Sequence, residues 1–401
     1  MPTHARLYDI VLFGATGFTG ELTAAHLARN ASATTRWAIA GRDPAKLGAL
    51  RERLAAIDPA GGPPGLMCVD ADDASALREL AAATRVVAST VGPYLRHGGP
   101  LVAACAEAGT DYVDLCGEQE FVDRVYVDHH ERAVRSGARL VHACGFDSIP
   151  YDLGVLYAVN LLPRDVALRV DGFVRASGAT SGGTFHSAIG AMSRPREAEA
   201  ARRARRVLEP RPEGRRVRAV GGRPRHDPVA RMWAIPLPTI DPHVVVRSAA
   251  ALERYGPDFE YRHYAAVRHL PVAVAGVLGV GALSALARVP AARERLLAWR
   301  PAGSGPSAQA RAKAWFQALF IAEGGGRRVV TRVSGGDPGY GETARMLAES
   351  ALCLAHDDLP GTAGQSTPAA AMGEALITRL IAAGIRFEVL RDEPLPEPTG
   401  R

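Results

Sequence analysis

The first twenty residues contain a strand, a glycine-rich turn and the start of a helix, written YDIVLFGATGFTG from Tyr8 to Gly20. The apolar run at 10–13 predicts a buried parallel strand, and residues 21–29 repeat apolar side chains at helical spacing. Gly14 permits a sharp reversal, Gly17 lets backbone approach a pyrophosphate, and Gly20 lets the helix lie near the sheet. This order predicts a dinucleotide site at the helix start, with GxxGxxG as a variant of GxGxxG.

The side chains near this turn specify the predicted cofactor. Thr16 and Phe18 belong to the turn, and we expect both to contact the dinucleotide. The second predicted strand ends at Arg42. An arginine at this tip accommodates a 2′-phosphate, whereas a carboxylate would bind the free 2′-hydroxyl of NAD. The sequence therefore predicts NADP(H). The alternative is that Arg42 is a solvated residue just ahead of a helix, which Asp43 and Pro44 would begin as N-cap and first residue. The two interpretations are compatible.

Six apolar segments alternate with helical segments across the first 150 residues, which predicts an α/β fold with a Rossmann-type, doubly wound parallel sheet. Ligands of such sheets lie beyond the carboxyl ends of the strands. Residues at the end of the fourth strand should therefore border the cofactor: Thr90, Val91 and Gly92. We expect the next helix to open at 98–100 and to cover 101–108.

The pattern changes near residue 150, which predicts three parts. Residues 1–150 form the NADP-binding domain, and 151–340 form a second α+β domain with a mixed sheet for substrate binding or dimerisation. Residues 341–391 supply C-terminal helices that pack back on the first domain. Within the second part, the β-rich pieces at 244–248 and 327–334 predict strands. A homodimer is left open.

Composition and cysteine usage indicate a soluble protein of a reducing compartment. Hydrophobic residues make up 47% of the chain and charged residues 22%, which is ordinary for a globular protein. The five cysteines are scattered without a CxxC pair, so we expect neither a disulfide framework nor a metal site. No signal peptide is visible before the first strand, and a cytoplasmic location is expected.

Positive charge is concentrated in one segment. Residues 194–225 hold twelve arginines and four glutamates, a local charge of +8, whereas the whole chain carries +6. Prolines within the segment predict a surface excursion. No aromatic interleaving or nucleic-acid module accompanies the arginines, so no nucleic-acid partner is expected.

An uncharged segment of eighteen residues, LPVAVAGVLGVGALSALA, covers 270–287. Its length is at the lower edge of what a membrane-spanning helix needs. A buried or interfacial helix is the favoured interpretation, and a spanning helix is the alternative. Together with the basic segment, it would suit peripheral contact with an anionic lipid surface.

Several phrases resemble a known family: VLFGATGFTG, STVGPYLRHGGPLVAACAEAGTDYVDLCGE, CGFDSIPYDLG, SGGTFHS and STPAAAMGEALITRL. They are similar to the saccharopine dehydrogenase-like oxidoreductases, and within these to the bacterial trans-acting enoyl reductases. The resemblance is dense over the first ~155 residues and continues in islands. It implies an NADP(H)-linked enzyme that reduces a carbon–carbon double bond in a lipid or polyketide-type precursor. It also implies work in glycolipid assembly, peripherally on the inner face of the plasma membrane.

The sequence lacks the usual catalytic signatures. There is no Tyr-x-x-x-Lys, G-x-S-x-G or HExxH, so the cofactor must supply the hydride while the protein orients and protonates the substrate. The candidate proton donors are Tyr94, Asp147 and Ser148, with His97 and His186 as weaker candidates. Tyr94 would alternatively pack against the nicotinamide, and Asp147 and Ser148 would alternatively cap a helix near residue 150.

Three functions follow from these observations. The first is an NADP-dependent reductase acting on a hydrophobic small-molecule or carrier-linked acyl substrate. The second is a non-catalytic NADP-binding sensor or scaffold at a lipid surface, which the missing acid–base pair leaves open. The third is an amino-acid dehydrogenase of the saccharopine type, against which the lipid-like segments argue.

Overall fold

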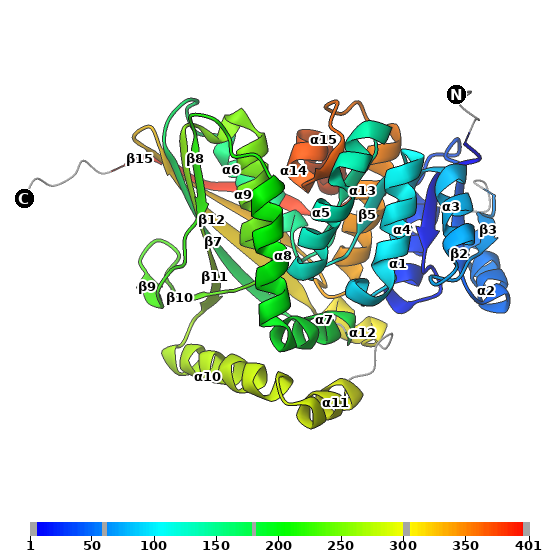
Figure 1. Ribbon diagram of the computed structural model, residues 1–401. Coiled ribbons are helices and arrows are strands. Elements are labelled where there is room, and N and C mark those ends of the chain that lie inside the picture. Colours follow the sequence, from blue (N-terminus) through cyan, green and yellow to red (C-terminus); the bar gives the residue numbers. More distant parts are fainter. Residues whose placement is uncertain (1–5, 58–61, 179–181, 300–304, 396–401) are drawn as a thin grey trace, which may run out of the picture.

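Two β-sheets organise the chain, and helices cover both faces of the first sheet (Figure 1). The computed structural model describes residues 6–57, 62–178, 182–299 and 305–395. The first sheet has seven parallel strands in the order β14-β6-β5-β4-β1-β2-β3. Its strands are β1 (Tyr8–Phe13), β2 (Trp37–Gly41), β3 (Gly65–Cys68), β4 (Thr84–Ser89), β5 (Asp111–Asp114), β6 (Arg139–Val141) and β14 (Gly364–Ser366).

This strand order confirms the predicted Rossmann-type fold. The chain runs outward from β1 through β2 to β3, then returns to the other side of β1 at β4. Ligands of doubly wound sheets bind at this reversal, beyond the carboxyl ends of β1 and β4. The strands are apolar because both faces are covered, and the side chains of Ile10, Leu12 and Val87 are fully buried.

The crossover helices form a layer on each face. They are α1 (Phe18–Asn30), α2 (Pro44–Ala55), α3 (Ala74–Ala83), α4 (Tyr94–Ala108) and α5 (Gln119–Ser136). Helix α6 (Ile149–Val159) follows β6 and leads into the second sheet. On one face α1 packs against α13 (Gly341–His356), and on the other face α4 packs between α3 and α5. The helix that was predicted to open at 98–100 begins earlier, at Tyr94. The buried carboxylate of Glu118 accepts hydrogen bonds from the N–H groups of Tyr94 and Leu95, at 3.0 and 2.9 Å, and so caps this start.

The second sheet is mixed, as predicted. Its order is β15-β13-β12-β7-β11-β10-β9, with β8 also paired to β11. The strands are β7 (Leu168–Ser177), β8 (Arg216–Ala219), β9 (Arg225–Asp227), β10 (Met232–Pro236), β11 (Asp258–Val267), β12 (Trp315–Gly324), β13 (Arg327–Gly335) and β15 (Arg386–Pro394). Helix α6 packs on β12 and β13, where a Cβ at Gly154 would lie 2.3 Å from the ring of Phe320. A glycine is therefore required for this close contact.

One strand prediction for the second part was wrong, and the arginine-rich segment has regular structure. Residues 244–248 are not a strand but part of α9 (Asp241–Ala251), after which a short 3-10 turn follows at Glu253–Tyr255. The arginine-rich segment forms α8 (Pro195–Leu208), which packs on α5, and then β8, and most of its residues are exposed or half-buried. Arg205 in α8 is only 3% exposed, and its guanidinium lies 4.1 Å from the ring centre of Tyr126.

The C-terminal residues join both sheets. After α13, β14 extends the first sheet beside β6, and α14 (Pro368–Ala371) begins at Thr367, whose hydroxyl accepts the N–H of Ala370. Helix α15 (Gly373–Ala382) follows, and β15 then adds an edge strand to the second sheet beside β13. The chain therefore crosses between the two sheets again near its end.

A helical arm extends from the second sheet at the lower edge of Figure 1. It consists of α10 (Leu270–Ala287) and α11 (Pro290–Trp299), which follow β11 in the sequence. Helix α12 (Ala308–Ala312) comes before β12 and lies back on the body of the molecule, where Arg311 stacks over the ring of Phe18. Within the described residues, α10 is the one helix long and apolar enough to cross a membrane by length and composition. Only 6% of this helix is buried, so of the predicted alternatives, a buried or an interfacial helix, the buried one is wrong.

Candidate active site

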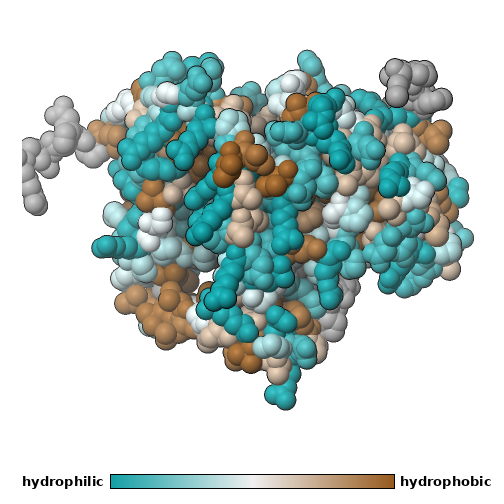
Figure 2. All heavy atoms as spheres, viewed as in Figure 1, coloured by the Kyte–Doolittle hydropathy of each residue, from teal (hydrophilic) through white to brown (hydrophobic). Residues whose placement is uncertain are grey.

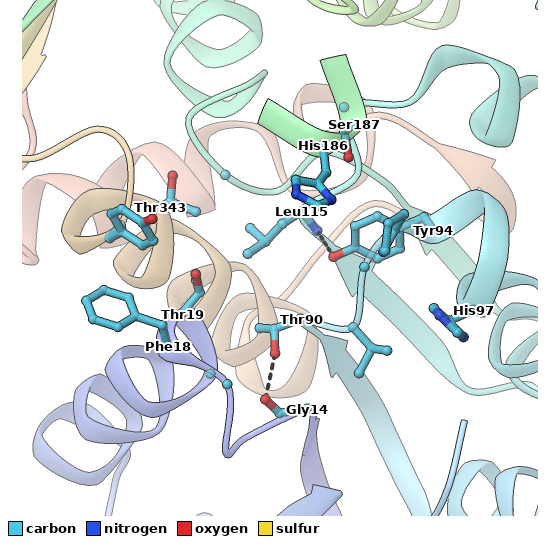
Figure 3. Close-up of a pocket in the computed structure, with 18 of the residues that line it drawn as sticks. Gly14, Phe18, Thr19, Thr90, Tyr94, His97, Leu115, His186, Ser187 and Thr343 are labelled. Carbon is cyan, nitrogen blue, oxygen red and sulfur yellow. Dashed lines mark hydrogen bonds between the residues drawn. The ribbon is translucent and has the colours of Figure 1, made fainter. Parts of the chain in front are cut away.

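A cavity of about 820 Å³ lies at the carboxyl edge of the first sheet, where sequence analysis placed the cofactor (Figure 3). Its volume is in the range of small-molecule and cofactor sites. Its walls come from the end of β1, the loop after β4, the start of α1, helix α7 (Gly182–Ser193) and the loop before α13. The cavity brings together these predicted site residues: Gly14, Thr16, Gly17, Phe18, Gly20, Arg42, Thr90, Val91, Gly92, Tyr94 and Asp147.

The end of β1 is held by β4. Gly14 has φ +84°, and a Cβ there would lie 2.6 Å from Cγ2 of Val91 and 2.7 Å from Oγ1 of Thr90. The hydroxyl of Thr90 donates to the carbonyl oxygens of Phe13 and Gly14, at 3.2 and 3.0 Å, and Figure 3 draws the second bond. Both the left-handed backbone and the close approach require glycine at this position.

At the start of α1, Gly20 packs tightly against the end of β1, whereas Gly17 faces open space. A Cβ at Gly20 would lie 2.2 Å from the carbonyl oxygen of Gly14, so only glycine lets the helix cross so near the strand end. A Cβ at Gly17 would meet nothing closer than that same oxygen at 3.4 Å. Gly17 is the N-cap and has no side-chain cap, and the first N–H groups of a helix have no partner within it. This cradle fits a phosphate group.

Arg42 lies at the tip of β2, exposed and at the edge of the cavity. The next residue, Asp43, caps α2 by accepting the N–H groups of Ala45 and Lys46, each at 3.1 Å. The cap fixes the backbone from which the Arg42 side chain extends. A guanidinium at this tip fits a 2′-phosphate, so the residues of the cavity fit NADP(H).

Tyr94 lines the cavity, but its hydroxyl is committed to the backbone. The hydroxyl donates to the carbonyl of Ser89 and accepts the N–H of Leu115, both at 3.1 Å. Its ring is 5% exposed and packs against Phe121, with ring centres 5.9 Å apart. Burial, with the nearby carboxylate of Asp114, raises the pKa of Tyr94 well above its usual value. These contacts are those of a residue that shapes the site.

Three acids line the cavity, Asp70, Asp72 and Asp147, and of these Asp147 lies on the loop after β6. Its half-buried carboxylate lies against the backbone of Gly117, where an added Cβ would be 2.8 Å from Oδ2. In the part of the chain that the structure describes, no group forms a hydrogen bond or ion pair with this carboxylate. Burial, helped by the negative charge of Asp241, raises the pKa of Asp147 to about 7. Asp147 is therefore able to hold or release a proton at neutral pH.

Ser148 does not line the cavity. It is completely buried, and its hydroxyl donates to Oδ1 of Asp241 at 3.3 Å. Asp241 also accepts the hydroxyl of Thr239, and its Oδ2 lies 3.4 Å from Nε2 of His263. Ser148 is the N-cap of α6 by position, as the capping alternative had it, but neither Asp147 nor Ser148 caps the helix with its side chain. Ser148 instead belongs to a buried polar cluster behind the cavity wall.

Residues from distant parts of the chain complete the site. His186 and Ser187 reach it from α7, and Figure 3 shows His186 pointing toward Leu115 and Tyr94. The hydroxyl of Ser187 donates to Oε1 of Glu118 at 2.8 Å, the same carboxylate that caps α4. His97 lies at the rim, with Nδ1 3.8 Å from Asp72. Nothing in the sequence pattern pointed to a role for Glu118, because its three partners, Tyr94, Leu95 and Ser187, lie 23 to 69 positions away in the chain.

Known proteins match both the nucleotide-binding part and the whole chain. The family described as "Saccharopine dehydrogenase NADP binding domain" matches residues 10–141. A putative trans-acting enoyl reductase of Mycobacterium tuberculosis is 38% identical over 98% of this chain and 99% of its own length. A trans-acting enoyl reductase of Mycobacterium ulcerans is 36% identical over 98% of this chain and 100% of its own length.

A solved structure shares the fold. Saccharopine dehydrogenase (L-Glu forming) from Saccharomyces cerevisiae aligns with 97% of this chain and 100% of its own, at a TM-score of 0.52 and 12% identity. The fold, the cradle at α1 and the matched domain agree on NADP(H) as the cofactor. The chain therefore belongs to the saccharopine dehydrogenase-like, NADP-dependent oxidoreductases, in the branch of the trans-acting enoyl reductases.

Proposed function

We propose that this protein reduces the conjugated carbon–carbon double bond of a hydrophobic acyl substrate, with NADPH, in the assembly of a lipid or glycolipid. The observation that carries the proposal is one cavity with two features: a backbone cradle for a phosphorylated dinucleotide, and one carboxylic acid, Asp147, without a protein partner among the described residues. The names of the full-length relatives support the same chemistry.

The reaction adds a hydride to the β-carbon and a proton to the α-carbon. NADPH, when bound, supplies the hydride and becomes NADP⁺. Asp147 gives its proton to the α-carbon and takes another from water, since its pKa of about 7 leaves much of it protonated at neutral pH. The start of α1 and Arg42 would hold the phosphates, and Tyr94 would support the wall beside the nicotinamide.

The cavity lining favours an apolar substrate over an amino-acid-type one. Among the described residues that line it, Arg42 is the only arginine or lysine, and the proposal assigns it to the 2′-phosphate. A substrate such as saccharopine carries several carboxylates, which need cations to pair with. Aromatic rings contribute to the walls instead, from Phe18, Phe146 and Tyr340. These side chains suit an acyl chain, free or carrier-linked.

The same proposal places the enzyme in the cytoplasm, at the inner face of the plasma membrane, where lipid precursors are found. The exposed apolar helix α10 supports this location. A homodimer stays a prediction.

The test is NADPH oxidation by the purified protein with a panel of thioesters. We expect turnover of trans-2-enoyl thioesters, faster with longer acyl chains, and little turnover with NADH. Reduction of 3-ketoacyl thioesters alone would contradict the proposal. Turnover of saccharopine, or of 2-oxoglutarate with lysine, would favour an amino-acid dehydrogenase. Tight NADPH binding with no turnover of any substrate would favour a sensor.

A further inference from the structure

Helix α10 exposes apolar side chains around its whole circumference. At 3.6 residues per turn, Val272, Val274 and Val280 point in three different directions, and all three are about half exposed. The mean hydropathy of the helix is 2.1, and Leu278 is 68% exposed. Figure 2 shows the resulting hydrophobic surface at the lower edge, where Figure 1 draws α10. A helix that is apolar on every side needs an apolar environment on every side.

Positive charges flank this helix. Exposed arginines stand immediately before and after it, at Arg268 and Arg288. Between residues 268 and 313 the chain carries seven arginines and lysines against a single acid, Glu294, a net charge of +6. Apolar helices flanked by Arg and Lys suit the boundary of an anionic bilayer, where the cations meet lipid headgroups.

The topology of the second sheet excludes a simple membrane crossing. The arm leaves the sheet after β11 and returns to it at β12, and both strands pair with β7. Both ends of the arm therefore lie on the same side of any membrane. A crossing by α10 would need a second crossing by residues 288–314, but these carry seven charged residues. The arm can enter one leaflet and leave it, but it cannot span.

The arm adjoins the cavity through α7. Helices α10 and α11 both pack against α7, the helix that contributes His186 and Ser187 to the cavity wall. Helix α7 therefore lies between the apolar surface of the arm and the cavity.

We propose that α10 and α11 form a monotopic membrane arm, which lies in the surface of an anionic bilayer and admits lipid-phase substrate to the cavity past α7. The admission of substrate rests on the proposed function, whereas the binding to lipid does not. A second copy of this chain fits the surface less well. A helix pair would cover one side of α10 and leave the other apolar side in water, and the two arms would bring together like charges.

The test is sedimentation of the full chain with vesicles of phosphatidylcholine, with and without phosphatidylglycerol. We expect strong binding to the anionic vesicles, weaker binding to pure phosphatidylcholine, and an affinity for the anionic vesicles that falls as the salt concentration rises. The double variant V277E/L278E should lose at least about tenfold in vesicle affinity, because two charges would enter the apolar boundary. Both residues are exposed, so the fold should not change.

A matched control places the same charges elsewhere. V207E/L208E changes two exposed apolar residues at the end of α8, away from the arm in Figure 1, and should bind vesicles like the wild type. Wild-type protein that stays in the supernatant with anionic vesicles would overturn the proposal. So would a change from dimer to monomer in V277E/L278E with vesicle binding intact, because a second copy of the chain would then cover α10.

Activity assays distinguish this proposal from the proposed function. V277E/L278E should reduce a short, water-soluble enoyl thioester at the wild-type rate but lose activity on a long-chain substrate presented in vesicles. Equal loss on both substrates would overturn the delivery role. If no enoyl thioester is reduced by any form, the proposed function fails, and vesicle sedimentation still tests the arm.

Discussion

Replacing Gly17 with alanine should separate cofactor binding from folding. Gly17 has φ −79°, which alanine adopts readily, and the new Cβ would contact only the carbonyl oxygen of Gly14, at 3.4 Å. The fold should therefore accept the methyl group, with a loss of about 1 kcal/mol from the weaker N-cap. The methyl group would instead occupy the open side of the cradle, where the pyrophosphate approaches the backbone. We predict a rise in the Kd for NADPH of at least tenfold, or about 1.4 kcal/mol.

Gly20→Ala and Gly48→Ala are the matched comparisons. The Cβ of Gly20→Ala would lie 2.2 Å from the Gly14 oxygen and 2.9 Å from the backbone of Ala15. The helix start would have to move by 3.4 − 2.2, or about 1.2 Å, at an overpacking cost of roughly 1–3 kcal/mol. This variant should lose both stability and binding. Gly48 in α2 has nothing within 4 Å, so its replacement should stabilise the protein by about 0.5–1 kcal/mol without affecting binding.

Isothermal titration with NADPH gives the Kd of each variant, and denaturant unfolding gives the free energy of unfolding. The expected pattern is weak binding with near-normal stability for Gly17→Ala, and losses in both for Gly20→Ala. Wild-type affinity in Gly17→Ala would refute the reasoning, because the pyrophosphate would then not lie on this turn.

Three further predictions concern charged groups. Arg42→Ala should weaken NADPH binding by about 10- to 100-fold and leave NADH binding unchanged in titrations, because only NADPH carries the 2′-phosphate. Asp147→Asn should lower kcat at least about 100-fold in the enoyl thioester assay, and in the wild type kcat/KM should fall as the pH rises through about 7, because the protonated acid is the active form. Asp152 is fully buried, accepts the N–H of Ala369 at 2.8 Å, and has a pKa raised by burial from 3.8 to about 7. The folded protein therefore binds a proton that the unfolded chain releases between these values, and this contribution to stability is lost as the pH rises. Between pH 5 and pH 8, the free energy of unfolding of Asp152→Asn should therefore fall less than that of the wild type, by a few kcal/mol at most, as denaturant unfolding at the two pH values would measure.

Each of these has a control or an opposing result. Lys46→Ala removes a neighbouring exposed cation in α2 and should not change coenzyme preference. Equal weakening of NADPH and NADH in Arg42→Ala would remove the 2′-phosphate role. An unchanged kcat in Asp147→Asn would assign the proton to water or to His186. Parallel stability curves for Asp152→Asn and the wild type would show that Asp152 is ionised in the folded state.

The first sheet was predictable because its strands are buried on both faces and appear as short apolar runs, each followed by a helical pattern. Residues 244–248 were wrongly predicted to form a strand because three consecutive valines favour a strand by local propensity. The structure buries Val244, Val245 and Ser248 on one side of α9, and this helix begins with Asp241 and Pro242. The same Asp-Pro signal correctly marked the start of α2.

The cofactor side of the site was predictable because the cradle is local. Gly14, Gly17 and Gly20 lie within seven residues of one strand–turn–helix segment, so their spacing can be read directly from the sequence. The substrate side depends on tertiary contacts between distant residues. Ser187 meets Glu118 across 69 positions, and Ser148 meets Asp241 across 93, so no periodicity indicates either pair. Ser148 was a candidate from its position after β6, but the second domain turns its hydroxyl away from the cavity.

A single-turnover reaction with NADPH carrying two deuterium atoms at C4 tests the central claim most directly. The substrate is a long-chain trans-2-enoyl thioester, and mass spectrometry locates the label in the product. We predict one deuterium at the β-carbon of a saturated acyl chain, and one proton from solvent at the α-carbon. An unreduced, unlabelled enoyl chain, or deuterium at the α-carbon in place of the β-carbon, would contradict the account.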